Sequence, residues 1–322
     1  MAGACRVVLA AVLAVAFHAV AQAQNYPQAR PITIVSPFGP GSAADTIGRI
    51  LQVPLGDALK QSIVIEARPG ANGAIAATFV ARAEPDGYTL LLSTNSPHSA
   101  APFLNKEIAY DPVKDFASVT RIGSFTLMLV INPKIPAHSI GELVAYAKAN
   151  PGKLSFASGN ASGIVAGETF KHWAGIDILH VPYKSTPQAL NDVLDGRVSM
   201  MFADFTTAIP HVRAETLRAL AVTRLKRSAL FPELPTMDEA GITGFEMDSW
   251  CGLFAPAGTP PQAVALLNGE LRRIIALPDI QKRMAVIGFE AFSSTPQELG
   301  DFVKVQLGKW GKMVKDAGIQ PE

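Results

Sequence analysis

Apolar and polar residues alternate along the chain in blocks that predict short buried strands separated by amphipathic helices. The first blocks predict strands over Ile32 to Ser36, Ser62 to Glu66 and Thr89 to Ser93. A glycine-containing turn and a helix follow each of the first two strands, and the first helix is predicted from about Ala43 to Leu59. Strands and helices in this order are typical of an α/β fold with a parallel sheet.

The alternation is interrupted in the middle of the chain. Strands are predicted over Ser118 to Gly123 and Leu127 to Asn132, and no helix fits between them. A second run of strands and helices begins with a helix from Ser139 to Asn150 and ends with a strand from Arg218 to Thr223. The close spacing of the two central strands therefore indicates that the chain crosses from one unit to another.

The last part of the chain returns to the first pattern. Trp250 to Ala255 predicts a strand, and amphipathic helices follow it to the C-terminus. Such a late return of helices suits packing against the first half of the chain. We therefore predict two α/β domains with at least two chain crossings, in which residues 24–124 and 247–322 form domain 1 and residues 125–246 form domain 2.

The N-terminal segment has the pattern of a secretory signal peptide. Arg6 precedes an apolar run from Val7 to Val20, which ends in the small residues of Ala21-Gln22-Ala23. The run is too short to favour a membrane-spanning helix. We therefore predict that residues 1–23 are removed and that the mature chain is a soluble exported protein.

Charge and cysteine content limit the possible partners. The chain has 28 basic and 27 acidic side chains, a formal net charge of +1 and no basic tract. This balance gives no support to a nucleic-acid partner. Cys5 leaves with the predicted signal peptide, so that Cys251 has no partner for an internal disulfide. Hydrophobic burial must therefore stabilise the mature chain without a disulfide. We expect the mature chain to be a monomer.

Small polar residues follow several of the predicted strands. Ligands of open parallel sheets collect beyond the carboxyl ends of the strands, where helix N-termini present free backbone N–H groups. Two of the loops at this position, one in each domain, are rich in glycine and serine, and they would form a cleft lined by donors if they faced each other. The polar residues at these strand ends are Ser42, Ser93, Asn95, Ser158, Asn160, Ser162 and Asp204.

Helix capping is an alternative role for these side chains. Ser42 and Asp45 have the spacing of a capping box. Asn95, Asp204 and the loop from Ser158 to Ser162 also precede predicted helices, where asparagine, aspartate and serine are favoured caps. Both roles stay open at this stage.

The first glycine loop also matches a dinucleotide-binding pattern. Gly39, Gly41 and Ala44 satisfy G-x-G-x-x-G/A. However, Pro40 removes a backbone N–H that a pyrophosphate would need, and the charge of Asp45 would repel it. We therefore predict that the chain binds no cofactor.

The sequence lacks the usual patterns of catalytic and metal-binding residues. It has no G-x-S-x-G nucleophile motif, and its histidines form neither H-x-H nor H-E-x-x-H. Glu168 and His172 lie one helical turn apart and are interpreted as a surface pair, and Cys251 is interpreted as a buried apolar residue. We predict neither enzymatic activity nor a metal site; the alternative is an exported α/β hydrolase or transferase acting on a small carboxylic substrate.

A series of short motifs runs in a characteristic order along the mature chain. The motifs are Pro37 to Gly41, Arg68 to Gly70, Pro85 to Leu90, Tyr110 to Pro112, Ala147 to Lys153, His180 to Lys184, Leu217 to Thr223 and Phe254 to Pro260. In this order they resemble the Bug receptors, the extracytoplasmic solute-binding proteins of tripartite tricarboxylate transporters. The resemblance implies a two-domain Venus-flytrap of the type II periplasmic-binding-protein architecture, located in the periplasm and without enzymatic activity.

The resemblance also implies where the ligand binds. Backbone groups of the loop from Phe38 to Asp45 and of the facing loop from Ser158 to Gly163 would hold a small carboxylate or a related amide. The closed form would then be presented to the large and small membrane subunits of a transporter. The resemblance extends the candidate binding residues to Phe38, Gly39, Gly41, Ala43, Asp45, Gly163 and Trp250.

The chain departs from the residues usual in this family at positions near the expected cleft. Gly41-Ser42 replaces a glycine pair, Ile164 stands where histidine is common, Ala203-Asp204 replaces Asp-Asn, and Cys251 replaces an aromatic residue. Because neither glycine loop contains arginine, we expect helix N-termini and neutral donors to hold the anion. If Asp204 faces the cleft, an amino or hydroxyl group is expected at the far end of the ligand.

Overall fold

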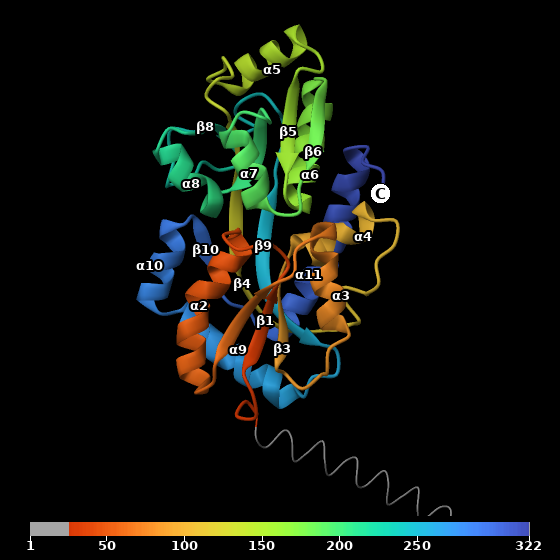
Figure 1. Cartoon of the computed structure of the whole chain (residues 1–322), viewed down its shortest axis with the longest axis vertical. Coiled ribbons are helices and arrows are strands. Elements are labelled where there is room, and N and C mark those ends of the chain that lie inside the picture. Colours follow the sequence, from red (N-terminus) through yellow and green to blue (C-terminus); the bar gives the residue numbers. More distant parts are fainter. Residues whose placement is uncertain (1–25, 322) are drawn as a thin grey trace, which may run out of the picture.

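The computed structural model describes residues 26–321. The predicted signal peptide, residues 1–23, lies outside this range. Within residues 26–321, no helix combines the length and the apolar content that are needed to cross a membrane. The folded chain forms two lobes, which Figure 1 shows at opposite ends of the long axis of the molecule, and each lobe has helices packed on a sheet. The predicted α/β class is confirmed.

The first lobe contains the N-terminal and C-terminal parts of the chain. Its strands are β1 (Ile32–Ser36), β2 (Ile63–Ala67), β3 (Thr89–Thr94), β9 (Asp248–Pro256) and β10 (Phe289–Ala291). Its helices are α2 (Ala43–Leu59), α3 (Ala74–Ala81), α4 (Ala101–Leu104), α9 (Pro261–Ile275), α10 (Pro278–Val286) and α11 (Pro296–Asp316), with the short helices η1 (Ala71–Gly73) and η2 (Ser96–Ala100). Strands β1, β2 and β3 are parallel, whereas β9 runs antiparallel to β3, so the sheet is mixed.

The second lobe contains the middle of the chain. Its strands are β5 (Leu154–Ser158), β6 (Ile178–Pro182), β7 (Met200–Asp204) and β8 (Arg218–Val222). Its helices are α5 (Ile140–Ala149), α6 (Ala161–Ala174), α7 (Thr186–Leu194) and α8 (Phe205–Arg213). Strand β5 lies between β6 and β7 and is parallel to both, as the alternation of strands and helices predicts.

One long strand, β4 (Phe116–Ile131), belongs to both lobes. It pairs with β9 from Phe116 to Thr126 and with β7 from Leu127 to Ile131. The prediction of two separate strands in this region is therefore wrong. The polar residues Ser124 and Thr126 gave the appearance of a break, but both are buried and pair with β9, so the strand continues through them.

The C-terminal helix α11 packs against the cores of both lobes. Leu299 and Val303, in its first half, belong to the apolar cluster of the first lobe that contains Trp250. Trp310 and Val314, in its second half, belong to a cluster that includes second-lobe side chains of β5 and α6. Figure 1 shows the end of α11 beside the second lobe. The two lobes therefore share an apolar contact outside the region where the polar loops meet.

Candidate ligand-binding site

Four helices begin at the boundary between the lobes. Helix α2 of the first lobe follows Ser42, and helices α6, α7 and α8 of the second lobe follow Asn160, Ser185 and Asp204. Ser42 and Asn160 cap their own helices through side-chain oxygens, whereas Ser185 and Asp204 do not. A helix N-terminus carries a partial positive charge and unpaired N–H groups, so their convergence suits an anionic group.

A small cavity lies among these helix N-termini. Its volume is about 10 Å³, which is room for about one water molecule. A ligand of several heavy atoms therefore needs the lobes to move apart. The cavity is lined by Phe38, Ser42, Ala43, Ala44, Thr94, Ser96, Phe125 and Ser249 of the first lobe and by Asn160, Ser162, Thr186 and Asp204 of the second.

Hydrogen bonds cross between the lobes around this cavity. The amide of Asn95 donates to Ser162 Oγ at 2.8 Å. The hydroxyl oxygen of Ser96 accepts from the backbone N–H of Ala161 at 3.1 Å. On the other side, the backbone N–H of Gly39 donates to Ser185 Oγ at 3.1 Å. Both glycine and serine loops thus make direct contact with the opposite lobe, and the structure is a closed one.

Asp45 supports the first loop from within. Its Oδ2 accepts hydrogen bonds from the backbone N–H of Gly41 at 3.0 Å and from Arg49 Nε at 2.9 Å. The backbone of Gly41 has a φ of 80°, which glycine adopts without strain. Asp45 is buried but does not line the cavity. In this structure Asp45 stabilises the start of α2 by accepting from Gly41, whereas the backbone N–H of Ser42, which a capping box would use, donates to the carbonyl of Gly39.

The second loop is organised by Asn160. Its Oδ1 accepts from the backbone N–H of Gly163 at 2.9 Å, and its amide donates to Thr186 Oγ1 at 3.1 Å. Asn160 and Ser162 line the cavity, whereas Gly163 and Ser158 do not. The loop from Ser158 to Gly163 therefore presents alternate residues to the cavity, and the N–H of Gly163 is already used by the cap.

Two residues expected at the site lie in the core of the first lobe instead of lining the cavity. Ser93 Oγ is 2.6 Å from His98 Nδ1. Trp250 is fully buried against Phe254 and Phe302. Successive side chains of a strand point to opposite faces. Each of the two residues is therefore turned away from the cavity, while its neighbour in the strand, Thr94 or Ser249, lines it.

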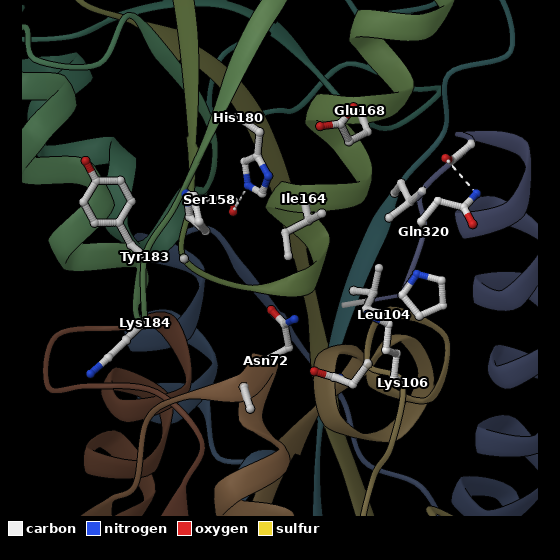
Figure 2. Close-up of a pocket in the computed structure, with 17 residues that line it drawn as sticks. Asn72, Leu104, Lys106, Ser158, Ile164, Glu168, His180, Tyr183, Lys184 and Gln320 are labelled. Carbon is white, nitrogen blue, oxygen red and sulfur yellow. Dashed lines mark hydrogen bonds between the residues drawn. The ribbon is translucent and has the colours of Figure 1, made fainter.

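Ser158 lies beside a second and larger groove between the lobes. The groove has a volume of about 700 Å³ and is walled by both lobes and by the residues that follow α11. Figure 2 shows Ser158, Ile164 and His180 of the second lobe on one side of it and Asn72 and Lys106 of the first lobe on the other. Ser158 Oγ is 2.6 Å from His180 Nε2. The loop from Ser158 to Gly163 therefore separates this groove from the small cavity.

Burial changes the pKa values of an acidic group and a thiol group near the site. Burial raises the pKa of Asp204 to about 6, because a carboxylate loses its hydration there. Burial also raises the pKa of the Cys251 thiol well above its usual range, which fits the prediction of a buried apolar residue.

Glu168 pairs with Lys171 at 3.9 Å rather than with His172. Within residues 26–321, no group of three or more His, Cys, Asp or Glu side chains has an arrangement that could hold a metal ion.

Several residues of the cavity were not predicted from the sequence. Thr186, Ser249 and Ser96 line it, and Ser185 makes a contact between the lobes. Ser185 followed by Thr186-Pro187 has the pattern of a helix N-cap with proline in the first turn. This pattern could have located the start of the helix. The role of Ser249 depends on the pairing of β9 with β4 and has no local signal.

Comparisons with known proteins identify the family of the chain. The family described as the tripartite tricarboxylate transporter family receptor matches residues 47–319. BugT of Bordetella pertussis is 35% identical over 302 residues, which cover 92% of this chain and 92% of BugT. A protein of R. palustris solved with adipate has a TM-score of 0.90 and 33% identity, and the match covers 92% of this chain and 100% of that one.

MatC from Rhodopseudomonas palustris, solved with bound malate, has a TM-score of 0.84 and 31% identity, with 89% of this chain and 99% of MatC covered. These matches confirm the two-domain Venus-flytrap architecture and the resemblance to Bug receptors. They give no support to the alternative of an exported hydrolase or transferase. The chain belongs to the family of tripartite tricarboxylate transporter receptors, which are periplasmic solute-binding proteins and not enzymes.

Proposed function

We propose that this receptor captures a small carboxylate, or a related amide, in the cavity between its lobes. The observation that carries the proposal is the convergence of helix N-termini from both lobes on a cavity whose lining, among the described residues, includes no lysine, arginine or histidine. Backbone N–H groups and hydroxyls would therefore hold the acid group. Adipate and malate in the two similar structures support a ligand of this class.

Closure of the lobes would couple binding to transport. We propose that residues 24–124 with 247–322 and residues 125–246 move as two bodies. A ligand that contacts both would then favour the closed form, because it binds that form more tightly. Cleavage after Ala23 would release the mature chain as a monomer, and large and small membrane subunits of a tripartite transporter would recognise the closed form. The hydrogen bonds between the lobes support such a closed form.

A thermal-shift and calorimetry screen of the mature chain tests the proposal. The panel pairs each carboxylate with the matching amide and the matching primary alcohol, for example succinate with succinamide and 1,4-butanediol. A ligand at 100 times its dissociation constant should stabilise the protein by about 2.7 kcal/mol. Carboxylates are expected to shift the melting temperature and the alcohols are not. If no carboxylate or amide in the panel binds, the proposal is wrong.

A further inference from the structure

Asp204 occupies a helix N-cap position that it does not use for capping. It ends strand β7 and precedes α8, yet its side chain accepts no hydrogen bond from the first turn of that helix. The contact made at this point is from Thr207 Oγ1 to the backbone carbonyl of Asp204, at 3.0 Å. The side chain is 5% exposed and lines the cavity between the lobes. Apart from an interaction with its own backbone N–H, the carboxylate is available to a ligand that enters that cavity.

The carboxylate of Asp204 also has no cationic partner in the described part of the chain. It forms no ion pair, and no charged side chain acts on its ionisation. Arg49 on α2 and Arg224 after β8 pair with other carboxylates, Arg49 with Asp45 at 2.9 Å and Arg224 with Asp248 at 2.7 Å. The other groups around the cavity are hydroxyls, one amide and apolar side chains. The start of α8 offers this buried carboxylate only a partial positive charge, and a cation in the cavity would further offset the cost of its burial.

We infer that Asp204 binds a protonated amine of the ligand, so that this receptor selects small amino carboxylates over dicarboxylates. The inference rests on the proposed function, because the N-termini of α2, α6 and α7 are taken to hold the carboxylate of the same ligand. A ligand with one carboxylate and one ammonium group would offer a partner both to these helix N-termini and to Asp204. A second carboxylate in place of the ammonium group would face the like charge of Asp204.

Calorimetry at pH 7.5 with matched ligands tests the inference. One series is 4-aminobutanoate, 4-hydroxybutanoate, butanoate and succinate, and the other is alanine, lactate and propanoate. Only the group in the place of the ammonium changes within each series: it lies at the far end of the molecule in the first series and on the carbon next to the carboxylate in the second. Butanoate and propanoate, the methyl members, carry a hydrogen atom in its place. The ammonium member is expected to bind at least tenfold more tightly than the others of its series. Ammonium members that bind no better than their hydroxyl or methyl counterparts would overturn the inference.

The variant Asp204→Asn keeps the size of the side chain and removes its charge. It is expected to weaken the ammonium members at least tenfold, to leave the hydroxyl and methyl members within about twofold, and to bind succinate more tightly than the wild type does. Asp301→Asn, which removes an exposed charge on α11, is the matched control and should change none of these values. Equal weakening of all ligands by Asp204→Asn would also contradict the inference.

The two proposals fail in different ways. Binding of succinate or the hydroxy acids without binding of the amino acids would overturn the role of Asp204 and leave the proposed function standing. Binding of no carboxylate of any kind would overturn both. The wild-type series decides between these outcomes even if Asp204→Asn does not fold, and circular dichroism checks the fold of each variant.

Discussion

The side-chain amide of Asn95 in the first lobe donates a hydrogen bond to the hydroxyl oxygen of Ser162 in the second, at 2.8 Å. The amide oxygen of Asn95 in turn accepts a hydrogen bond from Ser249. Asn95 is fully buried, so that its amide has no access to water when the lobes are closed. This bond therefore links the stability of the closed form to the packing between the lobes.

Replacing Ser162 with alanine removes the acceptor and leaves the Asn95 amide buried without a partner in the closed form. The penalty for such a group is about 1–3 kcal/mol. The closed population should fall, and ligand affinity should fall with it by about fivefold or more. Calorimetry gives the affinity, and small-angle X-ray scattering should show a larger radius of gyration without ligand. An unchanged affinity and radius would contradict a role for this bond in closure.

Ser93→Ala is the matched control for that experiment. Ser93 lies in the same strand end as Asn95 and is equally buried, but its hydroxyl contacts His98 within the first lobe. The substitution should therefore lower the free energy of unfolding and leave the radius of gyration of the folded protein unchanged.

Gly159→Ala should disturb the second loop. A Cβ atom at this position would lie 2.2 Å from the backbone nitrogen of Thr186 and 2.3 Å from the carbonyl carbon of Ser185. These are backbone atoms, so the two loops would have to separate. We expect a loss of about 1–3 kcal/mol in the free energy of unfolding and a loss of ligand binding, because Ser185 and Thr186 lie at the lobe boundary.

Gly308→Ala is the control for Gly159→Ala, and its effect on stability is expected to be the opposite. A Cβ atom there meets nothing within 4 Å, and the residue lies in the interior of helix α11. Alanine is favoured over glycine in a helix by up to about 1 kcal/mol, so this variant should be more stable than the wild type. Urea unfolding compares the two variants, and equal changes in both would show that close backbone approach is not the cause.

The sequence predicted the strand and helix alternation because most elements have a clear apolar pattern, and several are bounded by glycine or proline. It also placed Ser42, Asn160, Ser162 and Asp204 at one site, since all follow the ends of strands. It did not show which face of a strand each residue would occupy. Trp250 and Ser93 were expected at the cleft, but adjacent residues of a strand point to opposite faces, and the side chains of these two point into the core.

The remaining parts of the site depend on contacts between distant segments. Gly39 and Ser185 are joined although 146 positions separate them, and neither segment carries a signal for the other. The continuity of β4 through Ser124 and Thr126 depends likewise on pairing with β9. Such features follow from tertiary packing and not from local pattern.

Trp310→Ala should destabilise the protein strongly. The indole is 1% exposed, packs with side chains of both lobes, and donates to Gln306 Oε1 at 3.2 Å. Removal of a buried tryptophan side chain costs about 3–5 kcal/mol. Val305→Ala on the same helix is the control, since Val305 is 68% exposed and should change the free energy of unfolding by no more than about 0.5 kcal/mol. Equal effects in chemical denaturation would contradict the packing of α11 on both cores.

His98 should make the protein less stable in mild acid. It is fully buried, stacks on Phe254 with ring centroids 3.9 Å apart, and burial lowers its pKa to about 3. In the unfolded chain the pKa of histidine is about 6.5, so between these values the unfolded state takes up a proton that the folded state does not. The free energy of unfolding contributed by this residue is therefore constant above about pH 6.5 and falls as the pH decreases below it.

His98→Phe keeps an aromatic ring against Phe254 and removes the titrating group. Between pH 7 and pH 5 the wild type should lose about 2 kcal/mol relative to this variant, because each pH unit below 6.5 costs about 1.4 kcal/mol. Urea unfolding of both proteins at the two pH values measures the difference. Asp204 acts in the opposite direction: burial raises its pKa to about 6, so protonation there favours the folded state as the pH decreases. The comparison must therefore be made between wild type and variant, where the contribution of Asp204 cancels, and a difference independent of pH would show that His98 is protonated equally in both states.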